Sequence, residues 1–426
     1  MKDKKSAITL EQFEWVIFVI VLIVLFFSTQ TYFGTANYSR IYRIDRICIL
    51  VFLGTSLCVN HRMIKCKKVD FLVFRIVMLP CFLQFIISIF YYMINHRIAL
   101  SSLIEANMQA LLVCFMAIVA YNLFGKKTLK AVLIAAIVNY FVYVATCIIQ
   151  YGPLALFQAG TDTKASRLLE VHEVTFVFGL LIVYFVISEY STIKLIKKRW
   201  LFLLIVFCLL GFKRILIMAM AVGIVIYFST QKAKKPTKII IISSLMIVIS
   251  LIWVFLSSSW DILNEISVKF GIDLAGRNWI YSNFYPYYDF SLTYAGAGIG
   301  YVQEKIYEMS SMVMASMSLN GHAIGLHNEY LRLFIELGFW PYIAYFIIIW
   351  PISIKVLYYR VGYRVSLMYF VLWTVTGICI ATDNLLTYPN FMFAFWLILI
   401  TVINENKQYD NIKYQIVYQT RKRRRL

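Results

Sequence analysis

Residues 238–256 read KIIIISSLMIVISLIWVFL, an apolar stretch whose one charged residue, Lys238, stands at its start. A helix of about 20 mainly apolar residues crosses the roughly 30 Å hydrocarbon core of a bilayer. Similar runs recur along the chain, in which 61% of the residues are hydrophobic and only 15% are charged. Because soluble domains have a different balance, we expect an all-α integral membrane protein that crosses its membrane many times.

About twelve apolar segments are candidate transmembrane helices. The first segment, near Trp15, follows Lys2, Lys4 and Lys5, and the apolar core of a signal peptide also follows basic residues. No cleavage site with small residues comes after it, so we interpret it as a transmembrane helix. We expect a single membrane domain, residues 1–426. The segments cover residues 14–30, 45–60, 70–93, 103–122, 129–150, 172–189, 197–211, 214–230, 238–256, 339–357, 365–382 and 388–403.

The positions of Lys and Arg predict the orientation. Basic residues follow every second segment and fill the C-terminal tail, and such residues mark the cytoplasmic side, so we expect both termini in the cytoplasm. Arg40, Arg43 and Arg46, on the first outer loop, are either an exception or a hint that an anionic ligand approaches there. The net charge of +20 is spread over short loops beside the spans, which favours contact with anionic lipids over nucleic acid.

The sequence offers no ligand set for a metal. The eight cysteines lie in apolar segments or in one Lys-rich inner loop, without the spacing of a disulfide framework or a zinc site. No Asp-x-Asp motif, typical of metal-dependent sugar-nucleotide transferases, occurs. We therefore expect no metal and no cofactor.

The segment 257–338, between the ninth and tenth predicted spans, is much longer than any inner loop. Loops of this length are usually functional or disordered, and its aromatic clusters argue against disorder. The glycines of 294–300 lack the strand-to-helix setting of a nucleotide motif, so we expect them to permit tight turns. A second, shorter outer segment covers residues 151–171. We expect the outer side to be the working side, with the long loop carrying part of the active site.

Arg214 lies at the turn of the apolar stretch 201–228, which has basic residues on both flanks and must therefore cross the membrane twice. Its two arms reach only about 20–24 Å each, so Arg214 is expected below the outer surface. There it would face a polar cavity or a partner. The alternative is that Lys213 and Arg214 extend to the interface.

Titratable residues crowd within 325–338, at the end of the long loop. On a helix, Glu329, Arg332 and Glu336 share one face at the i+3 and i+4 spacings of ion pairs, whereas His327 lies on another face. A histidine at a helix start, beside an aromatic loop, is a candidate general base. We expect a supporting role for Asn328, Glu329, Arg332 and Glu336.

The order of these motifs resembles the bacterial O-antigen polymerase and O-antigen ligase superfamily. The resemblance covers about half of the chain, from Arg214 to the last predicted span. It rests on the motifs Arg214, Gly276-Arg277, His327-Asn328-x-x-Leu331 and Glu336-x-Gly338.

The resemblance implies a metal-independent, inverting glycosyltransferase in the bacterial inner membrane, with an undecaprenyl-pyrophosphate-linked oligosaccharide as donor. Arg214 and Arg277 would bind the pyrophosphate, since a guanidinium pairs with two phosphate oxygens and stays charged in a partly dry site. His327 would take the proton of the acceptor hydroxyl, which belongs to a second glycan at the outer face.

Among the activities of the superfamily, we favour a polymerase of O-antigen or capsule that acts on a lipid-linked repeat unit. The outer loop is not basic enough to favour the phosphorylated lipid A core sugars that a ligase uses. A ligase stays one alternative, and a flippase or other transporter is another, although the paired repeats of transporters are missing. Membrane lipids are expected partners, and the resemblance also allows a chain-length regulator and a flippase.

Overall fold

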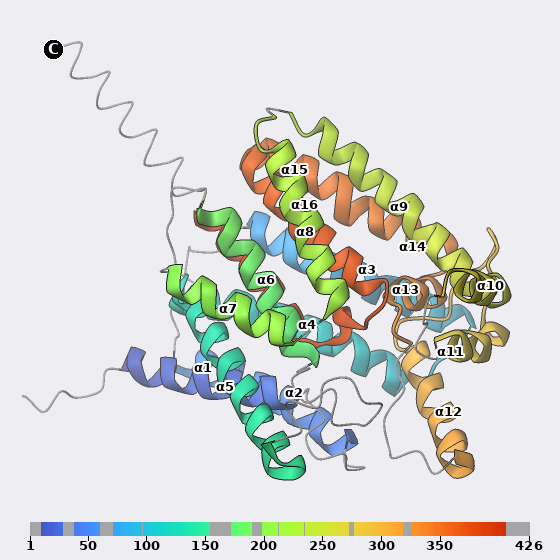
Figure 1. Cartoon of the computed structure of the whole chain (residues 1–426), viewed down its shortest axis with the longest axis horizontal. Helices are drawn as coiled ribbons and strands as arrows, with labels where there is room; N and C mark the ends of the chain where they lie inside the picture. Colours follow the sequence, from blue (N-terminus) through green and yellow to red (C-terminus); the bar gives the residue numbers. More distant parts are fainter. Residues whose placement is uncertain are drawn as a thin grey trace, which may run out of the picture.

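The structure is a computed structural model that describes residues 10–28, 38–59, 71–95, 97–153, 172–189, 198–211, 213–233, 235–271, 277–317 and 326–405. Within these ranges every regular element is a helix and no strand occurs, so the all-α prediction is confirmed for them. Figure 1 shows the helices packed side by side, with several of the longest nearly parallel. The N-terminal lysines, the basic C-terminal tail and most of 151–171 lie outside the described residues.

The first half of the chain supplies long apolar helices. They are α1 (Leu10–Ser28), α2 (Tyr38–Val59), α3 (Phe71–Asn95), α4 (Leu100–Phe124), α5 (Lys127–Tyr151), α6 (His172–Glu189) and α7 (Lys198–Leu210). The second half continues with α8 (Arg214–Thr230), α9 (Thr237–Ser258), α14 (Phe339–Ile347), η6 (Ile348–Ile352), α15 (Ser353–Arg360), α16 (Tyr363–Ile380), η7 (Leu385–Thr387) and a last helix, Pro389–Glu405.

Helices α14, η6 and α15 form one continuous run with a π-helical turn in its middle. Pro351 lies inside that turn, where its missing N–H and its ring disturb the regular hydrogen-bond ladder. The Ser353 hydroxyl donates to the Ile348 carbonyl at 2.8 Å, in addition to the backbone N–H of Ser353.

Six of the described helices are long and apolar enough to cross a membrane, namely Leu72–Ile94, Leu100–Phe124, Lys127–Thr146, Thr237–Ser258, Phe339–Arg360 and Tyr363–Ile380. Shorter apolar helices are Gln12–Phe27, Arg46–Ser56, Glu173–Ser188, Leu201–Leu210, Arg214–Thr230 and Pro389–Glu405. Together they coincide with the segments expected from the sequence. The chain therefore has the build of a multi-pass membrane protein, while the number of crossings and their direction stay predictions.

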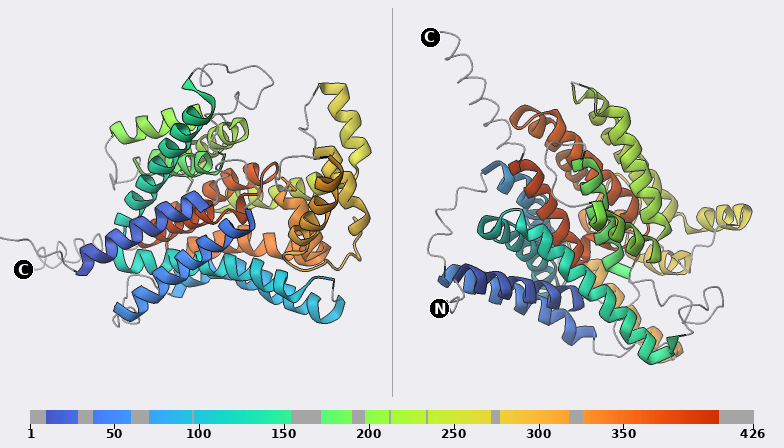
Figure 2. Two further views of the ribbon diagram at one scale, coloured as in Figure 1. Left: turned by 90° about the horizontal axis from the view of Figure 1, so that it is seen from below. Right: turned by 60° about the vertical axis from the view of Figure 1, so that its left-hand side comes forward.

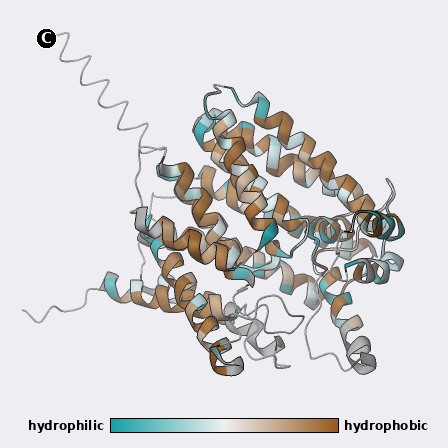
Figure 3. Cartoon of the chain, viewed as in Figure 1, coloured by the Kyte–Doolittle hydropathy of each residue, from teal (hydrophilic) through white to brown (hydrophobic). Residues whose placement is uncertain are grey.

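The long segment between α9 and α14 is folded into short helices rather than an open loop. They are α10 (Trp260–Phe270), α11 (Arg277–Phe284), η5 (Tyr285–Tyr287), α12 (Tyr301–Met317) and α13 (Glu329–Leu337). Figures 1 and 2 show them gathered at one end of the long helices. In Figure 3 the long helices are mainly hydrophobic, and hydrophilic residues collect at this end.

The glycine-rich turn before α12 packs directly against the end of α13. Gly296, Gly298 and Gly300 have φ of 84°, 98° and 100°, so the predicted tight turns are present. A Cβ on Gly296 would lie 2.6 Å from the backbone N of Gly338, so no larger residue fits. The backbone N–H groups of Ala297 and Gly298 donate to carbonyls at the end of α13, at 3.0 and 2.9 Å.

The five cysteines whose side chains are described, Cys48, Cys81, Cys114, Cys208 and Cys379, form no disulfide bond with one another.

Candidate functional site

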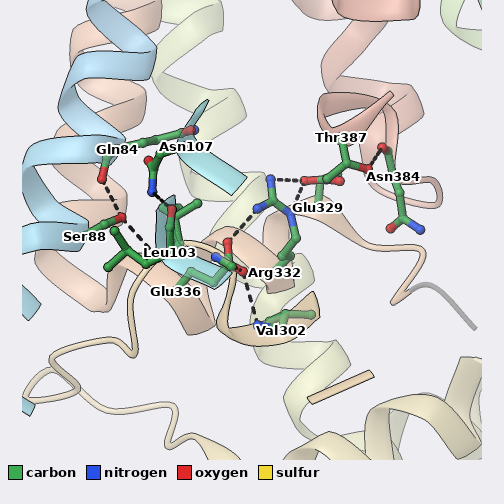
Figure 4. A network of polar contacts seen from close by, with 12 residues as sticks. Gln84, Ser88, Leu103, Asn107, Val302, Glu329, Arg332, Glu336, Asn384 and Thr387 are labelled. Carbon is green, nitrogen blue, oxygen red and sulfur yellow. Dashed lines mark hydrogen bonds and ion pairs between the residues drawn. The ribbon is translucent and has the colours of Figure 1, made fainter. Parts of the chain in front are cut away.

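Helix α13 carries the ion-pair network predicted from its spacing. Arg332 lies 2.5 Å from Glu329 Oε2 and 2.6 Å from Glu336 Oε2, and both carboxylates are fully buried. Figure 4 shows the guanidinium between the two carboxylates. Because this arginine is held by two acids of its own helix, its charge is already balanced.

Glu336 also anchors the glycine-rich turn. Its Oε1 accepts hydrogen bonds from the backbone N–H groups of Gly300 and Val302, at 3.0 and 3.2 Å, where α12 begins. A carboxylate at a helix start satisfies orphan N–H groups and complements the helix dipole. Both oxygens of Glu336 are therefore engaged, which supports the expected supporting role.

Glu329 differs from Glu336 because one of its oxygens has nothing to bind. Oε2 contacts Arg332, whereas Oε1 is buried and lacks a hydrogen-bond partner among the described residues. Burial raises the pKa of Glu329 to about 7, a rise that Arg332 opposes and that the nearby acids Glu336 and Asp383 reinforce. This carboxyl can therefore exchange a proton near neutral pH.

His327 and Asn328 form the entry to α13. His327 is half-buried and has φ of 50°, a left-handed conformation that costs energy for any residue other than glycine. Asn328 caps the helix, since its Oδ1 accepts from the Leu331 N–H at 3.0 Å. Its Nδ2 donates to Ser257 Oγ, 2.9 Å away at the end of α9. The cap thus fixes where the histidine lies.

Arg277 begins α11 and reaches the loop after α16. Its Nη2 donates to the Thr382 carbonyl at 3.0 Å, while its Nε is buried and has no hydrogen-bond partner among the described residues. One turn further along α11, burial raises the pKa of the Tyr281 hydroxyl to about 12, a shift that Asn328 and Arg277 oppose. The neighbourhood of α11 and the start of α13 is set by the end of α9, where Ser257 contacts Asn328 and Ser258 contacts Tyr288.

Arg214 is carried by a different helix from Arg277 and His327. It is the first residue of α8, and its side chain is exposed. Lys213 before it lies 5.9 Å from the ring centre of Phe176, whose ring contacts Phe391 in the last helix. Arg214 therefore lies near the start of the last helix. Gly276 and Gly325 lie outside the described residues.

A cavity of about 200 Å³ lies beside α13, and no local sequence pattern predicted it. Arg332 and Glu336 line it, whereas His327, Arg214 and Arg277 do not. Arg46 lines it too and forms an ion pair with Glu105 of α4. Arg46 was one of the exceptions to the charge pattern in the sequence.

The loop between α16 and the last helix connects the two regions. Thr382, near its start, accepts the hydrogen bond from Arg277, and Leu386, Thr387 and Pro389 line the cavity. Asp383 accepts from the Tyr388 hydroxyl at 2.8 Å, which braces the loop internally. The cavity and the Arg277 region thus share one short segment of backbone.

The fold defines a helical multi-pass membrane protein with a polar site at one end. Comparison with protein-family models, with curated proteins and with solved structures found no match. No cluster of three or more potential metal ligands occurs among the described residues.

Proposed function

We propose that this chain is a polymerase of a bacterial surface polysaccharide, either O-antigen or capsule. It would transfer a glycan from undecaprenyl pyrophosphate to a lipid-linked repeat unit at the outer face of the inner membrane. In this proposal the chain crosses that membrane about twelve times with both termini in the cytoplasm, and α10 to α13 lie outside.

The observation that carries the proposal is that the end of α9 contacts both the start of α13, through Ser257 and Asn328, and the segment just after α11, through Ser258 and Tyr288. Arg277 and His327 therefore belong to neighbouring segments. Arg277 keeps a buried, unpartnered Nε beside a polar region, and a buried donor without an acceptor is costly unless a ligand completes it. A phosphate oxygen is such an acceptor. By contrast, Arg332 is held by two carboxylates and is unavailable for phosphate.

The transfer needs three things from the protein. The acceptor oxygen forms a bond to the anomeric carbon while the bond from that carbon to the phosphate oxygen breaks, and the pyrophosphate leaves with the electron pair. Arg277, with Arg214 as a second cation, stabilises the negative charge that grows on the leaving group. His327 takes the hydroxyl proton. Direct attack of this kind inverts the anomeric configuration.

The test replaces His327 by Ala in cells that make the polysaccharide, with surface glycan and extracted lipid-linked glycan separated on gels. Loss of long chains, with single repeats still reaching the surface, supports a polymerase. Long lipid-linked chains stranded before attachment would instead identify a ligase, and normal chain length would overturn the role of His327.

Substitutions of Arg277 test the pyrophosphate site, and a substitution of a second arginine is the control. Arg277→Ala should also abolish elongation, and Arg277→Lys should restore little of it, because lysine lacks the planar fork that binds two oxygens. Arg360→Ala, in an exposed arginine at the end of α15, is the matched control and should leave chain length unchanged. Membrane content of each variant is measured by immunoblot.

A further inference from the structure

The cavity beside α13 is lined by charged residues of both signs, with acids in excess. Its charged lining consists of two arginines, Arg46 and Arg332, and three glutamates, Glu105, Glu304 and Glu336. Arg46 pairs with Glu105, and Arg332 pairs with Glu336 and with the buried Glu329 behind it. The cavity therefore presents no unbalanced positive charge to a phosphate or a carboxylate, and like charges repel at close range.

Neutral polar groups supply the remaining hydrogen-bonding capacity. Gln84, Gln109 and Gln303 come from three different helices, α3, α4 and α12. Each amide offers both donors and acceptors. Gln84 donates to the Tyr345 hydroxyl at 2.7 Å, and Gln109 reaches the Thr387 carbonyl only at 3.4 Å. A ligand rich in hydroxyl groups matches such a lining, because a hydroxyl also donates and accepts.

Aromatic rings provide flat apolar walls among these polar groups. Trp373 and Trp396 line the cavity from buried positions, whereas Tyr307 is 48% exposed. A sugar ring has polar edges and an apolar face of C–H groups, so one ring can satisfy amides and pack on an aromatic wall together. A lipid tail would instead leave the charged and amide groups of this lining unsatisfied. The volume of about 200 Å³ lies below the roughly 300–1,000 Å³ of drug-sized sites, which suits one ring.

We propose that this cavity binds a single uncharged sugar residue of a glycan substrate. The inference rests on the proposed function for the identity of that substrate, and it adds a restriction to it: the residue held here carries neither phosphate nor carboxylate. The pyrophosphate of the donor binds elsewhere, at Arg277, and the two sites meet at the loop that follows α16.

The test measures binding by purified protein in lipid nanodiscs, with saturation-transfer NMR as the readout. The probes are glucose and glucuronate, which have the same ring and differ in the carboxylate. Glucose should bind measurably, and glucuronate should bind about tenfold more weakly, the cost of placing a carboxylate among acids. Equal or tighter binding of glucuronate would overturn the inference, and so would the absence of binding by any neutral hexose or N-acetylhexosamine.

Substitutions of cavity-lining residues test whether the sugar binds in the cavity. Gln109→Leu should weaken glucose binding, and Gln303→Leu, in an exposed side chain, serves the same purpose if Gln109→Leu fails to fold. Glu304→Gln removes one excess negative charge and should narrow the difference between the two probes. Gln231→Leu, at the end of α8 and outside the cavity lining, is the matched control. Unchanged binding in the cavity variants would refute the proposal.

Different results would contradict the proposed polymerase function and the proposed sugar site. His327→Ala lies outside the cavity lining and should keep sugar binding even where elongation is lost. Sugar binding without polymerase activity in the wild-type chain would remove the proposed function alone. Normal elongation in a chain whose cavity binds no sugar would remove this inference alone.

Discussion

Asn328 joins two helices through one side chain. Its Nδ2 donates to Ser257 Oγ at 2.9 Å, at the end of α9, while its Oδ1 caps α13. The end of an apolar, membrane-length helix is thereby fixed to the start of the helix that follows His327. The position of the candidate base thus depends on an amide beside it.

Replacing Asn328 by Ala should lower stability by about 1–2 kcal/mol, because the cap and the bond to Ser257 are both lost. Ser257→Ala removes only the second contact and should cost less. Thermal unfolding midpoints of the purified proteins in detergent check this order. Ser244→Ala, in an exposed serine of the same helix, is the control. Equal midpoints for Asn328→Ala and the wild type would contradict the capping role.

Replacing Glu336 by Ala should destabilise the protein by roughly 3–5 kcal/mol, because Arg332 would stay buried with part of its charge uncompensated. Glu308→Ala breaks an exposed pair with Lys305 and should cost only about 0.2–1 kcal/mol. Chemical denaturation of the two variants gives the comparison. Similar losses would show that burial adds nothing to the Arg332 pair.

The contribution of Glu329 to the free energy of unfolding should fall as pH rises from about 5 to 8. Its pKa in the folded protein is raised from 4.5 to about 7, so the folded state binds more protons than the unfolded state between these values, and stability is lost as pH rises through this window. Glu329→Gln should remove that part of the pH dependence, measured as unfolding midpoints across this range. Glu265→Gln, in an exposed side chain of α10, should leave it unchanged. A Glu329→Gln profile identical to that of the wild type would contradict the shift.

Two glycine variants separate backbone strain from steric overlap. Gly338 and Gly271 both have positive φ, 78° and 63°, but a Cβ on Gly338 would lie 2.4 Å from the Ala295 carbonyl carbon, whereas a Cβ on Gly271 would meet nothing within 4 Å. Gly271→Ala should cost about 1–2 kcal/mol from its backbone alone. Gly338→Ala should cost more than about 3 kcal/mol and lower the yield of folded protein. Equal yields and midpoints would show that the glycine-rich turn can move away from α13.

The sequence predicted the helices well because the length and polarity of an apolar run are local properties. Residues 238–256 needed no partner to be recognised, and the structure has a helix from Thr237 to Ser258. The Glu329–Arg332–Glu336 network was also predictable, since i+3 and i+4 spacing is fixed by the helix itself.

The cavity could not be predicted because it is assembled from residues far apart in the chain. Arg46, Glu105 and Arg332 meet only when α2, α4 and α13 pack together, and nothing in the local pattern of any of them indicates the other two. The positive φ of His327 was equally hidden, because no turn-forming glycine or other local signal marks that position. The depth of Arg214 in a membrane and the orientation of the chain stay predictions.

The loop that follows α16 has one further consequence. A molecule at Arg277 would lie near Thr382, and a molecule in the cavity would contact Leu386, Thr387 and Pro389 of the same short loop. Any displacement of this backbone by the first occupant changes the binding free energy of the second, and such a coupling acts with equal size in both directions. Each of the two bound molecules would then change the affinity for the other, without direct contact between them.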